Sequence, residues 1–79
     1  MKEFILVIDD EKAQREILTG FLKKLGYKVE KAACGQEGLQ IAANNPVELV
    51  LTDFKMPDMD GITVLQEIKK LNPEIGVII

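Results

Sequence analysis

Three aspartates that each follow a short apolar run are the residues of this sequence best suited to chemistry. Asp9 and Asp10 come directly after the run at residues 4–8, and Asp53 comes directly after a second such run. The sequence has no histidine and one cysteine, so a metal site here would rest on oxygen ligands. Carboxylates that share a pocket repel one another, and a cation or protonation relieves that repulsion. Hard oxygen ligands favour magnesium, manganese or calcium over zinc.

The chemistry that such a group of carboxylates supports is phosphoryl transfer. Magnesium in proteins uses one or two carboxylates, keeps several waters and takes further oxygens from a phosphate. A carboxylate can also act as the nucleophile and form an acyl phosphate, while a metal neutralises charge on the group in transit. Taken singly, Asp9 and Asp10 could merely cap a helix, and Asp53 could be an ordinary loop carboxylate. The functional interpretation therefore depends on whether the fold brings the three together.

The segments that could position these residues alternate between strands and helices. Short apolar or alternating runs predict strands, and apolar residues at three-to-four-residue steps predict helices. The predicted strands cover residues 4–8, 27–32, 49–52 and 76–79, and the predicted helices cover residues 11–25, 35–43 and 61–71. This alternation is typical of a parallel sheet with helices on its faces. The chain is therefore expected to form one α/β domain.

The order of the strands follows from their composition. The second strand alternates and carries charge, which is typical of a sheet edge, whereas the first and third are mainly apolar and belong inside. With right-handed crossovers, this gives a doubly wound sheet of order 2-1-3-4. The winding reverses between the first and third strands, where open α/β sheets bind ligands. Because neighbouring strands lie about 4.8 Å apart, Asp9, Asp10 and Asp53 are expected to converge there.

The ends and apolar stripes of the helices can also be predicted. Asp10 is the expected N-cap of the first helix, and Gly26 is its expected stop. Apolar residues recur at three-to-four-residue steps along each helix. In the first helix these are Ala13, Ile17, Leu18, Phe21, Leu22 and Leu25, and in the third helix they are Ile62, Leu65, Ile68 and Leu71.

Composition limits the kind of protein. The chain has 79 residues, of which 47% are hydrophobic and 29% are charged, as in folded domains rather than disordered segments. No apolar run approaches the roughly 20 residues that span a bilayer, and the N-terminus lacks the features of a signal peptide. The net charge of −3 offers no electrostatic footprint for nucleic acid. The expected location is the cytoplasm, with no direct contact to nucleic acid or membrane.

Four motifs together resemble the response-regulator receiver domain. They are Ile-Asp-Asp-Glu at residues 8–11, Gly-Tyr-x-Val at residues 26–29, Gly-x-x-Gly-Leu at residues 35–39 and Asp-x-x-Met-Pro-x-Met-Asp-Gly at residues 53–61. The resemblance covers the whole chain, and the last motif is highly specific in combination with the first. It implies a flavodoxin-like fold of the doubly wound α/β class and a role in two-component signalling. Residues 52–57 look most like receivers attached to transcriptional activators.

The resemblance also implies roles for the site residues. Asp53 would accept a phosphoryl group from the phosphohistidine of a histidine kinase or phosphotransfer protein. Magnesium would be bound by Asp10, Asp53 and the backbone carbonyl of Lys55, with Asp9 acting mainly through water. The chain would then be a phosphoacceptor signalling domain that forms an acyl phosphate on itself, and not an enzyme that turns over a substrate.

The sequence departs from the family in where it stops. Receivers normally continue from the fourth strand to a Thr or Ser, a fifth strand that ends in Lys and a final helix, and residues 1–79 contain none of these. The expectation is therefore a truncated, N-terminal part of a receiver that does not switch by itself. The strand edge at residues 77–79 and the stripe formed by Ile17, Phe21 and Leu25 are expected to be left uncovered. Such surfaces predict a homo-oligomer joined through the fourth-strand edge or the sheet face near the first helix.

Two other functions fit parts of the sequence. A calcium-binding loop of the EF-hand type at residues 56–67 would take ligands from Asp58, Asp60 and Glu67. Its first position, however, is Met56, and a predicted strand rather than a helix precedes it. The second alternative is a receiver-like interaction module that is never phosphorylated, which the presence of all three aspartates disfavours.

Overall fold

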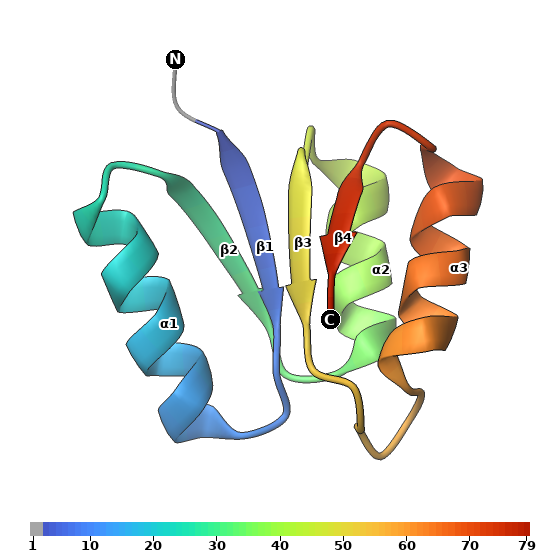
Figure 1. Ribbon diagram of the computed structural model, residues 1–79, viewed down its shortest axis with the longest axis horizontal. Coiled ribbons are helices and arrows are strands. Elements are labelled where there is room, and N and C mark those ends of the chain that lie inside the picture. Colours follow the sequence, from blue (N-terminus) through green and yellow to red (C-terminus); the bar gives the residue numbers. More distant parts are fainter. Residues whose placement is uncertain (1–2) are drawn as a thin grey trace.

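The chain folds into a four-stranded parallel sheet with helices on both faces (Figure 1). The computed structural model describes residues 3–79. The elements in chain order are β1 (Phe4–Ile8), α1 (Lys12–Lys24), β2 (Lys28–Ala32), α2 (Gly35–Asn44), β3 (Leu49–Thr52), α3 (Gly61–Leu71) and β4 (Gly76–Ile78). The strands lie in the order β2-β1-β3-β4, and every pair is parallel. The predicted α/β class and the strand order 2-1-3-4 are confirmed.

Strand β1 is the centre of the molecule. All five of its residues are buried, as its unbroken apolar run predicts for a strand covered on both faces. Ile8, its last residue, is level with Ala32 of β2 and with Thr52 of β3. Strand β2 is at the edge, and only Val29 and Ala32 are buried in it. The carboxyl ends of β2, β1 and β3 therefore lie side by side at the same end of the sheet.

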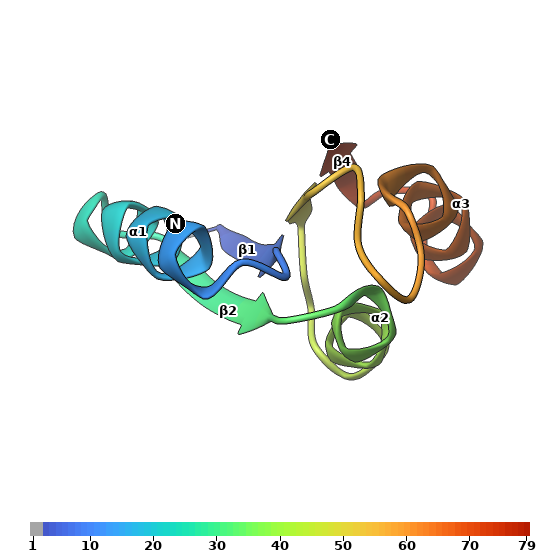
Figure 2. The same ribbon diagram turned by 90° about the horizontal axis from the view of Figure 1, so that it is seen from below.

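The helices divide between the two faces of the sheet (Figure 2). Helices α2 and α3 cover one face over a core whose fully buried members include Leu6, Ile8, Val50, Val64 and Ile68. Helix α1 covers the other face, where Leu22 packs against Ile5, Val7 and Val29. None of the helices within residues 3–79 is long and apolar enough to cross a membrane.

The apolar stripe of α1 is covered on one side only. Leu22 is buried and Leu18 is half-buried, whereas Ile17, Phe21 and Leu25 are 73%, 58% and 59% exposed, as predicted for these three residues. The helix also buries Thr19, whose hydroxyl donates to the Arg15 carbonyl oxygen at 2.9 Å. Because that bond satisfies the hydroxyl, a polar residue can occupy the contact face.

The buried face of α3 is displaced from the predicted apolar stripe. Val64 and Ile68 are fully buried, and Gly61 is buried at the start of the helix. Ile62 and Leu71, which belong to the predicted apolar stripe, are exposed instead. Helix α3 packs beside α2 as well as on the sheet (Figure 2), so its contact face is set by two neighbours and not by the apolar stripe alone.

Two glycines inside helices are expected to respond in opposite ways to replacement by alanine. Gly20 has open space where a Cβ would stand, so Gly20→Ala is expected to raise the free energy of unfolding by up to about 1 kcal/mol through helix propensity. A Cβ on Gly38 would lie 2.7 Å from Cγ1 of the buried Ile8. Gly38→Ala is therefore expected to lower the free energy of unfolding by about 1–2 kcal/mol. Urea unfolding measures both values. Equal shifts of the same sign would contradict the close packing of α2 on β1.

Candidate functional site

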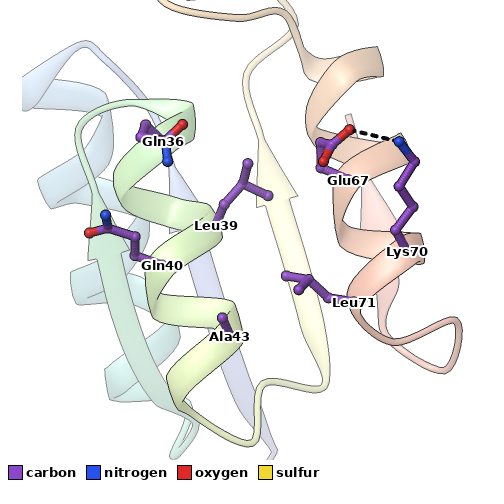
Figure 3. A pocket seen from close by; sticks show the side chains of 7 residues that line it. All are labelled: Gln36, Leu39, Gln40, Ala43, Glu67, Lys70 and Leu71. Carbon is purple, nitrogen blue, oxygen red and sulfur yellow. Dashed lines mark hydrogen bonds and ion pairs between the residues drawn. The ribbon is translucent and has the colours of Figure 1, made fainter.

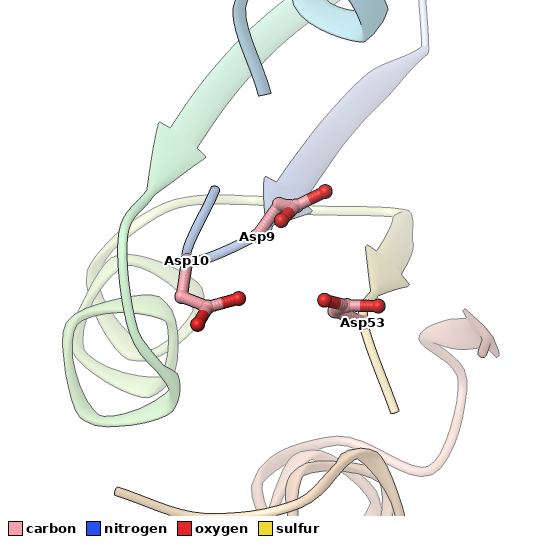
Figure 4. Close-up of side chains that lie close together, drawn as sticks. All are labelled: Asp9, Asp10 and Asp53. Carbon is pink, nitrogen blue, oxygen red and sulfur yellow. The ribbon is translucent and has the colours of Figure 1, made fainter. Parts of the chain in front are cut away.

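The backbone places the three aspartates at the carboxyl ends of the inner strands (Figure 4). The Asp9 N–H donates to the Ala32 carbonyl oxygen of β2 at 3.1 Å, and the Asp53 N–H donates to the Ile8 carbonyl oxygen of β1 at 3.0 Å. The sheet ladder thus continues one residue beyond the strands. Because these bonds fix the backbone of Asp9 and Asp53, they also fix the points from which the two side chains project.

The three side chains form one cluster. One carboxylate oxygen from each of Asp9, Asp10 and Asp53 lies within 4.8 Å of the other two. Asp9 and Asp53 are half-buried, and Asp10 is exposed. The Asp10 and Asp53 carboxylates point toward each other (Figure 4). Like charges at this separation repel, and a small cation relieves the repulsion. The all-oxygen donor set fits a hard divalent ion such as magnesium.

The three carboxylates differ in what else they bind. The Asp9 Oδ1 accepts a hydrogen bond from the Glu11 N–H at 2.9 Å, and the Arg15 Nη1 donates to the Asp9 carbonyl oxygen at 2.8 Å. Asp9 therefore holds the turn from β1 into α1. No hydrogen bond among residues 3–79 uses the carboxylate of Asp10 or Asp53. Both are free to bind an ion or a substrate.

The prediction that Asp10 caps α1 is wrong. The N-cap residue is Glu11, and its side chain makes no capping hydrogen bond. The neighbouring Asp9 takes up the Glu11 N–H instead. Since Asp10 is not used by the helix, its carboxylate is directed at Asp53 (Figure 4).

The loop between β3 and α3 carries Lys55, which is exposed. The loop is closed by the Gly61 N–H, which donates to the Phe54 carbonyl oxygen at 2.7 Å. A Cβ on Gly61 would lie 2.8 Å from the Asp53 carbonyl oxygen and 3.2 Å from the Phe54 Cα. Only glycine lets the first turn of α3 approach the backbone of Asp53 so closely. The end of the β3–α3 loop at Gly61 is therefore held beside the backbone of Asp53.

The Asp60 carboxylate caps α3, which makes stability depend on pH. Its Oδ1 accepts from the Thr63 N–H at 2.8 Å, and this bond is the main reason that the pKa of Asp60 is lowered from 3.8. A carboxyl group with a depressed folded-state pKa stabilises the fold above its unfolded pKa and loses that contribution as the pH falls through the folded pKa. The Asp60→Asn variant keeps a capping side chain without the charge.

Wild type is therefore expected to be more stable than Asp60→Asn near neutral pH and to lose this advantage as the pH falls below 3.8. Denaturant unfolding of both proteins across this range measures the difference. An advantage that is unchanged at the acidic end would mean that the charge of Asp60 does not contribute.

The proposed calcium ligands at residues 56–67 are used for other purposes. Asp58 accepts hydrogen bonds from α2, Asp60 caps α3, and Glu67 pairs with Lys70 at 3.2 Å. Within residues 3–79, the acidic side chains close enough to share an ion are those of Asp9, Asp10 and Asp53. The EF-hand alternative is not favoured.

A shallow groove between α2 and α3 is a second concave surface (Figure 3). It is lined by Gln36, Leu39, Gln40, Ala43, Glu67, Lys70 and Leu71. None of the three clustered aspartates lines it, so it is separate from the acidic site. The sequence pattern did not indicate this groove.

The sequence profile of the response regulator receiver domain matches residues 5–79. The chain belongs to this family. Receiver domains are signalling domains of two-component systems, and the predicted resemblance is confirmed. The flavodoxin-like arrangement of the sheet is that of solved receivers, for example one from Methanospirillum hungatei that superposes with a TM-score of 0.94 at 36% identity and covers 98% of this chain and 62% of that one.

Curated relatives fall into more than one class of signalling protein. The transcriptional regulatory protein ZraR of Escherichia coli is 44% identical over 75 residues, which cover 95% of this chain and 17% of ZraR. Sporulation initiation phosphotransferase F of Bacillus subtilis is 40% identical over 79 residues, which cover 100% of this chain and 64% of that protein. The chain thus spans less than two thirds of the length of either relative.

One solved neighbour bears on the metal. The response regulator TrrA of Thermotoga maritima was crystallised in complex with Mg²⁺ and BeF, and it superposes with a TM-score of 0.90 at 35% identity, covering 95% of this chain and 65% of that one.

Proposed function

We propose that this chain is the phosphoacceptor part of a receiver, in which Asp53 takes a phosphoryl group from the phosphohistidine of a histidine kinase or phosphotransfer protein. The observation that carries the proposal is the state of the Asp53 carboxylate. It is half-buried at the end of an inner strand, it has no hydrogen-bond partner among residues 3–79, and it lies beside two further carboxylates. A nucleophile needs such a free and fixed oxygen.

The transfer is a substitution at phosphorus. A carboxylate oxygen of Asp53 forms the new P–O bond while the P–N bond to the donor imidazole breaks, and that bonding pair stays on the imidazole nitrogen. The product is an acyl phosphate on Asp53. The ladder bond from the Asp53 N–H to β1 holds the attacking residue in place during this step. Hydrolysis of the acyl phosphate returns the carboxylate, so the chain acts as a signal carrier.

The proposed metal ligands are Asp10, Asp53 and the backbone carbonyl of Lys55, with Asp9 acting through water. The hydrogen bond from Glu11 to Asp9 supports a less direct role for Asp9, since one of its oxygens is already used. When bound, magnesium would neutralise charge on the phosphoryl oxygens. The magnesium complex of TrrA supports this choice of ion.

Two further parts of the proposal concern the location of the chain in the cell and its self-association. A cytoplasmic location suits a domain that meets a kinase's phosphohistidine. Self-association through the β4 edge or the sheet face near α1 is also proposed, and it is supported by the exposed apolar side chains of Ile17, Phe21, Leu25 and Ile78.

Incubation with acetyl phosphate and magnesium tests the proposed function. Intact mass spectrometry is expected to show the addition of one phosphoryl group, and hydroxylamine is expected to remove it because acyl phosphates are labile to this nucleophile. A calcium-binding loop or a non-phosphorylated interaction module would give no adduct. An adduct that resists hydroxylamine would also contradict the proposal, since it would not be an acyl phosphate.

A further inference from the structure

Asp58 links the β3–α3 loop to the start of α2. Its Oδ1 accepts from the Gly35 N–H at 3.1 Å, and its Oδ2 accepts from the Gln36 N–H at 2.8 Å. These are the first two residues of α2, whose N-cap residue, Cys34, makes no side-chain capping bond. The amide groups at a helix start have no partner inside the helix, and a carboxylate there is stabilised by the helix dipole. Asp58 therefore caps α2 from a distant part of the chain.

A steric contact accompanies this cap. A Cβ on Gly35 would lie 2.7 Å from the Met59 Sδ, so Met59 rests directly on the glycine. Met59 also packs against the core beneath α2 and α3. The pKa of Asp58 is lowered, chiefly by its bond to the Gln36 N–H, so the capping group is the charged carboxylate. The loop and the first turn of α2 are thus joined by hydrogen bonds and by packing.

These contacts hold the middle of the loop that follows Asp53. At one end the loop leaves β3 directly after Thr52, and at the other end Asp60 caps α3. Lys55 and Pro57 lie between these ends and are exposed. Apart from Asp58, residues 54–58 are held by the Phe54–Gly61 closure and by half-buried Met56, which packs against the core.

We propose that Asp58 is a positioning residue for the metal site: by capping α2 from the β3–α3 loop, it fixes the loop backbone that presents the Lys55 carbonyl to the ion. This inference rests on the proposed function, in which that carbonyl is a ligand. Residues that orient metal ligands typically change metal affinity by 10-fold or more when they are removed.

Glu37 provides a matched control on the same helix turn. Its Oε1 accepts from the Ala33 N–H at 2.7 Å, so it also fixes the start of α2. No hydrogen bond among residues 3–79 links it to the β3–α3 loop. If Asp58 merely stabilised α2, then Asp58→Ala and Glu37→Ala would affect the metal site alike.

The experiment compares wild type, Asp58→Ala, Asp58→Asn and Glu37→Ala. Titration calorimetry measures the Kd for Mg²⁺, and amide hydrogen exchange without metal measures protection of Gly35 and Gln36. Asp58→Ala is expected to raise the Kd roughly 10-fold and to lose protection at both amides. Asp58→Asn keeps one acceptor oxygen and is expected to fall between wild type and Asp58→Ala. Glu37→Ala is expected to leave the Kd unchanged.

Three results would overturn the inference. If Asp58→Ala binds Mg²⁺ with the wild-type Kd although the Gly35 and Gln36 amides have lost their protection, the cap does not position the metal site. A Kd raised equally in Glu37→Ala would show only a general effect of α2. Absence of magnesium binding in wild type would overturn the proposed function together with this inference, whereas either of the first two results would overturn the inference alone.

Discussion

Asp53→Asn is expected to abolish the hydroxylamine-labile phosphoryl adduct. The substitution keeps the size of the side chain but removes the nucleophilic carboxylate, and a neutral amide does not form an acyl phosphate under these conditions. Asp9 and Asp10 lie close by, but neither follows the inner strand β3, whose end projects Asp53 into the cluster. Loss of phosphorylation to the detection limit is the expected result by intact mass spectrometry.

Asp9→Asn is the matched control for this prediction. Its carboxylate holds the turn before α1 through the Glu11 N–H, and an asparagine oxygen can accept the same bond. Phosphorylation of Asp9→Asn is therefore expected to slow but to persist. An adduct that survives in Asp53→Asn while Asp9→Asn loses it would reverse the roles of the two aspartates.

Asp10→Ala is expected to remove most of the stabilisation that magnesium gives to the fold. A ligand that binds only the folded state at 100 times its Kd adds about 2.7 kcal/mol to the free energy of unfolding. Without metal, the same substitution is expected to raise stability by about 1 kcal/mol, because it removes a like charge from the cluster in a solvent-exposed position. The two effects have opposite signs, which makes the prediction specific.

Thermal unfolding with and without magnesium measures both effects. Glu30→Ala removes one negative charge from an exposed position on β2 and serves as the charge control. It is expected to keep the full magnesium response. If magnesium shifts the melting temperatures of wild type and Asp10→Ala equally, the ion binds elsewhere.

The sheet and its acidic edge could be predicted because their signals are local. The run at residues 4–8 is apolar on every position, so its burial on both faces was clear, and Leu49–Thr52 was found with its observed bounds. Once these two strands were placed inside, Asp9, Asp10 and Asp53 had to meet. The helix faces were harder, since an apolar stripe does not say how much of a helix its neighbours cover. In α1 it gave no sign that Thr19 is buried.

Contacts between distant segments could not be predicted from spacing. Asp58 was read as a possible calcium ligand, because a carboxylate in a loop has no local sign of its partner. Its partners, Gly35 and Gln36, lie more than 20 positions earlier, and only the packing of α2 beside the β3–α3 loop brings them together. The error at Asp10 has a different cause: the helix begins one residue later than predicted, with Glu11 as its N-cap, and Asp9 rather than Asp10 accepts from the Glu11 N–H.

The most direct test of the central claim is to locate the phosphoryl group chemically. After reaction with acetyl phosphate and magnesium, reduction with borohydride converts a phosphorylated aspartate into homoserine, and peptide sequencing by mass spectrometry finds its position. The proposed function predicts homoserine at position 53 and at no other aspartate. Homoserine at position 9 or 10, or a modified residue outside the acidic cluster, would contradict it.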